Sequence, residues 1–124
     1  MVESRARVPI RIKVAGVGEA PGELNRLTAP LTVGDILKIL PINGRTVPAQ
    51  GCIQIILGLR RGTEKPVTQV EAGTIAFWPR AMSLCIYPEA TRTYDPVNRV
   101  GKVTGNLEMF RSLKSGSRII IASA

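Results

Sequence analysis

The sequence has no histidine among its 124 residues and only two cysteines, Cys52 and Cys85. The missing imidazole excludes Ser-His-Asp and Cys-His triads, histidine-ligated zinc and histidine pH switches. Two cysteines are too few for a disulfide framework or for a cysteine-only zinc site. Both stand among apolar neighbours, which predicts buried free thiols in a reducing compartment. We therefore expect neither a metal site nor a cofactor.

Long apolar runs are absent as well. No run approaches the length of a membrane span, and the polar start Met1–Arg5 is followed by no apolar segment of a signal peptide. We therefore predict a cytoplasmic protein without a membrane partner. The composition, 44% hydrophobic and 21% charged, is typical of a globular protein. We expect one domain over residues 1–124, with a flexible start at residues 1–6.

Aromatic residues are scarce, at 4% of the chain, whereas 17 lysines and arginines against 9 acidic residues give a net charge of +8. Such a positive charge is typical of proteins that bind nucleic acid. The basic residues are, however, spread over three groups, at positions 5–13, 60–61 and 92–102. The aromatic stacking platforms of single-strand binders are also missing. A generally basic surface is therefore favoured over a nucleic-acid face.

The hydrophobic pattern predicts nine short strand-like runs, close to the count of an eight-stranded sheet, and two short helices. The predicted strands cover residues 8–14, 24–27, 45–47, 52–57, 67–70, 74–78, 83–87, 97–103 and 118–122, with residues 16–22 as a turn and 88–96 as a polar loop. One predicted helix starts at Thr32, with Asp35 completing a capping box, and ends at Pro41. The other covers residues 106–114. This order favours a small closed barrel with a helix over each open end.

The C-terminal part of the chain resembles a known family. Gly101-Lys102-Val103, the second predicted helix and Ile119-Ile120-Ile121-Ala122 resemble the end of cyclophilins. From Gly73 onward the sequence is similar to small prokaryotic cyclophilin-like barrel proteins of uncharacterised function. The shared residues are Trp78-Pro79, Leu84-Cys85-Ile86, Pro96, Asn98, Val100 to Val103 and Glu108. The resemblance implies a mainly β protein, a closed eight-stranded cyclophilin-like barrel with two short capping helices.

The resemblance also suggests an enzymatic activity, prolyl cis/trans isomerisation. In cyclophilins an arginine donates to the prolyl nitrogen and a glutamine orients the peptide, and these roles map onto Arg45 and Gln54. The pocket histidine has no counterpart in this chain. The phenylalanine-bearing strand has become Ser83-Leu84-Cys85-Ile86. The proline-binding set is thus incomplete, and a shared fold does not by itself imply a shared function.

We therefore predict a binding module that holds a small molecule or a peptide in a groove near the single tryptophan. The predicted ligand-binding residues are Trp78, Ile86, Tyr94 and Asn98. The first alternative is a weak peptidyl-prolyl isomerase with Arg45 and Gln54 as catalytic residues. The second is a basic nucleic-acid-binding protein. A homodimer is left open, because strands at a barrel seam can pair between copies.

Overall fold

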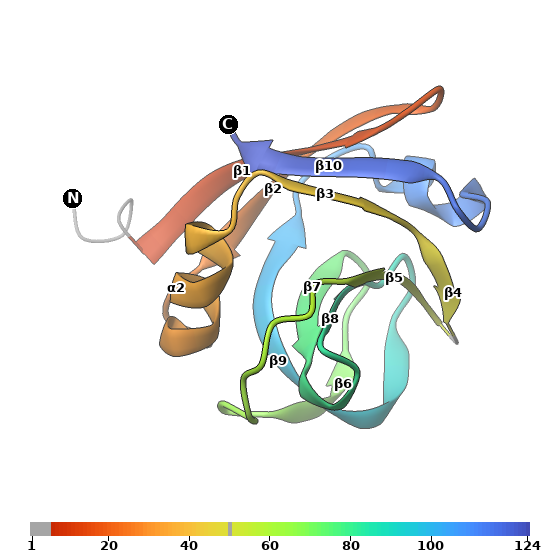
Figure 1. The fold of residues 1–124 in the computed structure, drawn as a ribbon. Coiled ribbons are helices and arrows are strands. Elements are labelled where there is room, and N and C mark those ends of the chain that lie inside the picture. Colours follow the sequence, from red (N-terminus) through yellow and green to blue (C-terminus); the bar gives the residue numbers. More distant parts are fainter. Residues whose placement is uncertain (1–5, 50) are drawn as a thin grey trace.

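The computed structural model describes residues 6–49 and 51–124 and is mainly β (Figure 1), as predicted. Its elements, in chain order, are β1 (Arg7–Val14), β2 (Gly18–Asn25), α2 (Pro30–Lys38), β3 (Ile42–Arg45), β4 (Val47–Ala49), β5 (Cys52–Ile56), β6 (Val67–Val70), β7 (Thr74–Trp78), η1 (Pro79–Ala81), β8 (Ser83–Ile86), β9 (Thr91–Val103), η2 (Leu107–Ser112) and β10 (Arg118–Ser123). The predicted flexible start lies outside the described residues, apart from Ala6. Within the described ranges, no helix is long and apolar enough to cross a membrane.

The strands form one antiparallel sheet that curls strongly but does not close. Its order is β3-β10-β1-β2-β9-β7-β8-β5-β4, and β6 pairs with β9 outside this path. The predicted closed eight-stranded barrel is therefore wrong. The path has nine strands, and among the described residues no backbone pairing joins its two ends.

The two ends of the path are successive pieces of chain, because only Thr46 separates β3 from β4. The buried Thr46 bonds to the turn before β10: its N–H donates to the Ser117 carbonyl at 2.9 Å, and its hydroxyl donates to the Lys114 carbonyl at 3.0 Å. Its own carbonyl accepts from Gly116 N–H at 2.7 Å. These bonds continue the pairing of β3 with β10 by one residue beyond Arg45 and Arg118.

The main core fills the inside of the curled sheet. Strand alternation sends every second side chain inward, so that Ile10, Ile12 and Val14 of β1 are at most 2% exposed. The helix α2 adds Val33 and Ile36 from one side of the sheet (Figure 1).

The second predicted helix is a six-residue 3₁₀ helix, η2, and not an α-helix. Asn106 enters it in the left-handed conformation, with φ of 52°. The tight turns of η2 set Met109 and Phe110 into the core.

Two strands are longer than predicted. β2 includes Pro21 and Gly22, which were expected in a turn, because β1 pairs with it along its whole length, from Gly18 opposite Val14 to Asn25 opposite Arg7. The turn is thereby confined to residues 15–17. Likewise β9 begins at residue 91, inside the predicted loop 88–96, because β6 pairs with its first part.

The first helix is capped from a distance and not by the predicted capping box. It begins at Pro30, and the carboxylate of Glu64 accepts hydrogen bonds from the N–H groups of Leu31 at 3.0 Å and Thr32 at 2.9 Å. The Thr32 hydroxyl donates to the same carboxylate at 2.7 Å. Burial opposes ionisation of Glu64, but these hydrogen bonds hold its pKa below the ordinary value. Asp35 instead pairs with Arg61, whose Nη2 lies 2.6 Å from Asp35 Oδ2.

A candidate ligand-binding cavity

A second, smaller apolar cluster lies on the outer face of strands β7, β8 and β5. Alternation along β7 sends Ile75 and Phe77 into the main core and Ala76 and Trp78 to the outer face. The cluster consists of Val70, Ala76, Cys85, Tyr87 and Val97, with Cys52, Val67 and Trp78 packed against it. These strands are thus apolar on both faces. Something must cover the outer face, and the first half of β9 does so together with β6.

The covering segment arches because β6 and β9 are paired out of step. Val67 pairs with Val97 and Gln69 with Arg92, so that two steps along β6 match five along β9. Residues 93–96 of β9 thus stand against Thr68 alone and bulge out of the ladder. Pro96 fits such a bulge because it has no N–H to donate.

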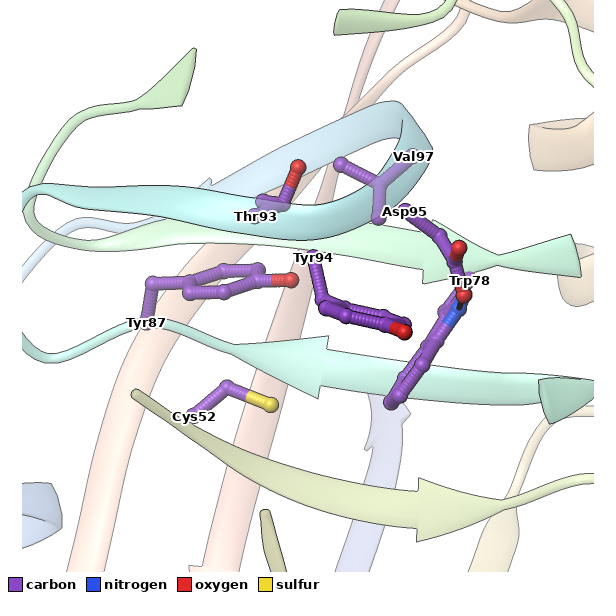
Figure 2. Close-up of a pocket in the computed structure, with 7 residues that line it drawn as sticks. All are labelled: Cys52, Trp78, Tyr87, Thr93, Tyr94, Asp95 and Val97. Carbon is purple, nitrogen blue, oxygen red and sulfur yellow. Dashed lines mark hydrogen bonds between the residues drawn. The ribbon is translucent and has the colours of Figure 1, made fainter. Parts of the chain in front are cut away.

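The arch encloses a cavity of about 290 Å³ (Figure 2). Seven residues line it: Cys52, Trp78, Tyr87, Thr93, Tyr94, Asp95 and Val97. Cys52 is the first residue of β5, Tyr87 directly follows β8, and Trp78 is the last residue of β7. In Figure 2 the Tyr87 hydroxyl and the Cys52 sulfur both lie on the side that faces Tyr94 and Trp78. Three aromatic rings therefore surround one hollow.

A hydrogen bond fixes the tryptophan at the mouth of the cavity. The indole Nε1 of Trp78 donates to Asp95 Oδ2 at 2.9 Å, and Arg80 Nη1 lies 3.5 Å from the other carboxylate oxygen. Asp95 belongs to the arch and Trp78 to the sheet, so the contact ties the two walls together. Tyr94 is 86% exposed and covers the cavity from the solvent side.

Two polar groups in the cavity wall are of chemical interest. Burial, and then the two neighbouring thiols, raise the pKa of Tyr87, so that its phenol keeps its proton and can donate a hydrogen bond. Thr93 Oγ1 is buried and has no hydrogen-bond partner among the described residues. In Figure 2 this oxygen lies on the Val97 side of the threonine.

The cysteines are free thiols, as the sequence predicts. Cys85 is fully buried, and Cys52 is partly exposed. The interaction with the Cys85 thiol lowers the pKa of Cys52, whereas the same interaction and burial raise the pKa of Cys85. Among the described residues, no group of three or more cysteine, aspartate or glutamate side chains is arranged to hold a metal ion.

The structure brings together two of the four predicted ligand-binding residues, Trp78 and Tyr94. Ile86 is completely buried in the main core, on the opposite face of β8 from the cavity. Asn98 is buried too, and its amide is fully engaged: it donates to the Thr32 hydroxyl and the Gly62 carbonyl and accepts from Glu64 N–H. Asn98 thus holds the loop of residues 57–66 against α2.

The two predicted catalytic residues do not line the cavity. Arg45 is exposed on β3, and its guanidinium donates to the Gly116 carbonyl at 3.0 Å. Gln54 lies on the outer face of β5 and donates to the Ser83 hydroxyl at 2.9 Å. Neither side chain is among the residues that line the cavity.

Five lining residues were not predicted: Cys52, Tyr87, Thr93, Asp95 and Val97. One signal in the sequence points to Tyr87. Within the predicted strand 83–87, Leu84 to Tyr87 are apolar at neighbouring positions, which is typical of a strand buried on both faces. Thr93, Asp95 and Val97 belong to the arch of β9, whose polar part was predicted as an open loop. Cys52 stands at the start of β5, on the face that the arch covers.

The family model of the cyclophilin-like proteins matches residues 8–122 of this chain. The chain belongs to the cyclophilin-like family. This confirms the resemblance inferred from the C-terminal motifs and extends it over nearly the whole sequence. No curated protein gives a significant match to this cyclophilin-like chain.

Solved structures show the same fold. The solution structure of the hypothetical protein AF2241 from Archaeoglobus fulgidus is similar with a TM-score of 0.78 and 23% identity over 96% of both chains. A structure of McbB in complex with tryptophan is similar with a TM-score of 0.73 and 16% identity. That match covers 92% of this cyclophilin-like chain and 44% of McbB. At these identities the similarity establishes the fold alone.

Proposed function

We propose that this cyclophilin-like protein binds a small, planar and mostly apolar molecule in the cavity beside Trp78. The observation that carries the proposal is the enclosure of one hollow by three aromatic side chains, those of Trp78, Tyr87 and Tyr94. Such rings bind flat apolar ligands by stacking and edge contacts. The cavity, at about 290 Å³, is just smaller than the roughly 300–1,000 Å³ typical of ligand pockets. This size favours a small molecule over an extended peptide.

Specificity would come from the few polar groups in the wall. The protonated Tyr87 hydroxyl suits a ligand that carries a hydrogen-bond acceptor, such as a carbonyl or carboxylate oxygen. Asp95 is engaged by Trp78 and Arg80 and serves to hold the wall in place. The buried Thr93 hydroxyl has no hydrogen-bond partner among the described residues, which costs about 1–3 kcal/mol of stability. A ligand atom that forms a hydrogen bond with this hydroxyl would remove that cost.

The test uses the emission of Trp78, the only tryptophan of the chain. The protein is titrated with benzoate and an X-Pro tetrapeptide by fluorescence. Binding of indole and L-tryptophan is followed by calorimetry, because both probes fluoresce in the same range as Trp78. Tryptophan is included because a structural neighbour was solved with it. We expect saturable binding of at least one planar probe. Flat titrations with every probe would contradict the proposal.

Two variants distinguish cavity binding from surface binding. Tyr87→Phe removes only the hydroxyl and should weaken an acceptor-bearing ligand by about tenfold, the loss of one hydrogen bond of about 1.4 kcal/mol. Tyr94→Ala removes the exposed cover and should weaken every ligand. Leu27→Ala is the matched control, because Leu27 is an apolar side chain 68% exposed away from the cavity. Equal affinities in Tyr94→Ala and Leu27→Ala would place the ligand elsewhere.

Two alternatives from the sequence stay predictions with tests of their own. Prolyl isomerisation by Arg45 and Gln54 requires that the protein raise the isomerisation rate of an X-Pro peptide above the rate in buffer, in a protease-coupled assay. This rate should fall in Arg45→Ala.

Nucleic-acid binding gains one supporting observation, since Arg60, Arg61 and Arg80 border a common shallow depression. Arg61 and Arg80 already pair with aspartates there. An RNA or DNA affinity that falls steeply with salt would support it. Cytoplasmic location, prokaryotic origin and a homodimer likewise stay predictions.

A further inference from the structure

The two cysteines form a pair across neighbouring strands. In the register of β5 and β8, Ile53 pairs with Ile86 and Gln54 with Cys85. Continued by one residue, this register sets Cys52 opposite Tyr87 and diagonal to Cys85. Residues two apart on a strand share a face, so both thiols lie on the outer face of the sheet. They belong to the same apolar cluster there.

The two thiols differ in access and acidity. Cys52 lines the cavity and is partly exposed, so that a small reagent can reach it. Cys85 is 0% exposed beneath it. Their interaction favours ionisation of Cys52 and disfavours that of Cys85. Since the thiolate is the reactive form, Cys52 is the thiol that meets an incoming reagent first.

We propose that Cys52 and Cys85 are an oxidisable pair, in which Cys52 reacts with a hydroperoxide entering the cavity and Cys85 resolves the product to a disulfide. The Cys52 thiolate attacks one peroxide oxygen, the O–O bond breaks, and the leaving oxygen takes up a proton as water or alcohol. The resulting sulfenic acid is attacked by the Cys85 sulfur, which loses its proton as the S–S bond forms and water leaves. Two thiols are oxidised and one peroxide is reduced.

The fold allows the small closure that this bond requires. Diagonal cross-strand residues have Cα atoms about 7–8 Å apart, and a disulfide requires about 4.4–6.8 Å. Cys52 is the first residue of β5 and follows Gly51, a glycine in the left-handed region with φ of +77°. On its other side β5 is held only by β4, a strand of three residues at the end of the sheet path. A shift of about 1 Å at this corner brings the two Cα atoms into range.

The test oxidises the reduced wild-type protein with a small excess of hydrogen peroxide and follows it by intact mass spectrometry. We expect loss of the mass of two hydrogen atoms, loss of both alkylatable thiols after denaturation, and a Cys52–Cys85 cross-link in the peptide map. A reducing agent should restore both thiols. Free cysteine added to the same solution serves as the control. The proposal is wrong if the peroxide consumes this free cysteine while both thiols of the protein stay intact. A disulfide between two chains, or Cys52 found as sulfinic acid with Cys85 free, would also overturn it.

Single-cysteine variants assign the roles. In Cys85→Ala the oxidised Cys52 has no resolving partner, so a dimedone adduct should accumulate on it. In Cys52→Ala the buried Cys85 should stay reduced under the same treatment. Reaction of Cys85 as fast as that of Cys52 would contradict the order of events. The wild-type cross-link tests the pair itself, whether or not either variant folds.

Discussion

The indole of Trp78 donates to the carboxylate of Asp95 at 2.9 Å, across the boundary between sheet and arch. Trp78 is the last residue of β7, and Asp95 lies in the bulged part of β9. The contact therefore ties the arch to the sheet at one side of the cavity, between two of the residues that line it.

Removal of the Asp95 acceptor should loosen the cavity wall. We expect Asp95→Ala to lower the free energy of unfolding by about 1–2 kcal/mol and to shift the emission of Trp78, because the indole N–H loses its partner. Asp95→Asn keeps a carbonyl oxygen and loses only the pairing with the exposed Arg80, so its effect should be less than half as large. Urea unfolding followed by fluorescence and circular dichroism measures both. Equal losses in the two variants would assign the effect to charge instead of the hydrogen bond.

Asn98 should be a strong determinant of stability and not of ligand affinity. Its amide bonds to Thr32, Gly62 and Glu64. Asn98→Ala would remove the bonds to the Gly62 carbonyl and the Glu64 N–H and leave the Thr32 hydroxyl only its bond to Glu64. We expect a loss of about 2–4 kcal/mol in the free energy of unfolding. Asn43→Ala, on the exposed side of β3, is the control and should change it by less than about 0.5 kcal/mol. A ligand affinity that falls in Asn98→Ala, with stability unchanged, would restore Asn98 as a ligand contact.

Glu64 should make the protein less stable in acid. Its pKa in the folded protein lies below the ordinary value of 4.5, so the folded state binds fewer protons than the unfolded state near that pH. The stabilisation is therefore complete above about pH 5 and is lost as the pH falls through the lowered pKa. Glu64→Gln should cost about 1 kcal/mol at pH 7, through the weakened cap of α2.

Denaturation at several pH values measures this contribution. The difference between wild type and Glu64→Gln should shrink from pH 6 to below about pH 4. Glu71→Gln is the control, because Glu71 is exposed and makes no side-chain hydrogen bond or ion pair with the described residues. A difference that is constant over this range would show that the charge of Glu64 is not what stabilises the helix.

Two glycine substitutions should have opposite effects. Gly101 lies on β9 between β2 and β7, and a Cβ there would overlap the backbone carbonyl of Glu23. We expect Gly101→Ala to cost about 3 kcal/mol or more, or to prevent folding. Gly34 lies inside α2 with open space around it, so Gly34→Ala should stabilise by about 0.5–1 kcal/mol. Thermal unfolding compares the two, and a stable Gly101→Ala protein would mean that β2 and β9 can separate.

The sequence alone determines much of this protein. Alternation along Val8 to Val14 identifies β1, and the predicted strands at 67–70 and 74–78 agree residue for residue with β6 and β7. The motifs from Trp78 to Ala122 identify the family. These features are local: each depends on the spacing of apolar residues or on a short motif, which the chain carries whatever its surroundings.

Tertiary structure alone decided the features that depend on distant pairs. Glu64 replaces the predicted capping box because a loop more than thirty residues away reaches the start of α2. Thr46, the single residue between the two ends of the sheet path, bonds to the distant 114–117 turn. The cavity exists because five steps of β9 are set against two of β6. Such an arrangement depends on which strands meet and in what register, and a single sequence read by its local periodicity does not contain that information.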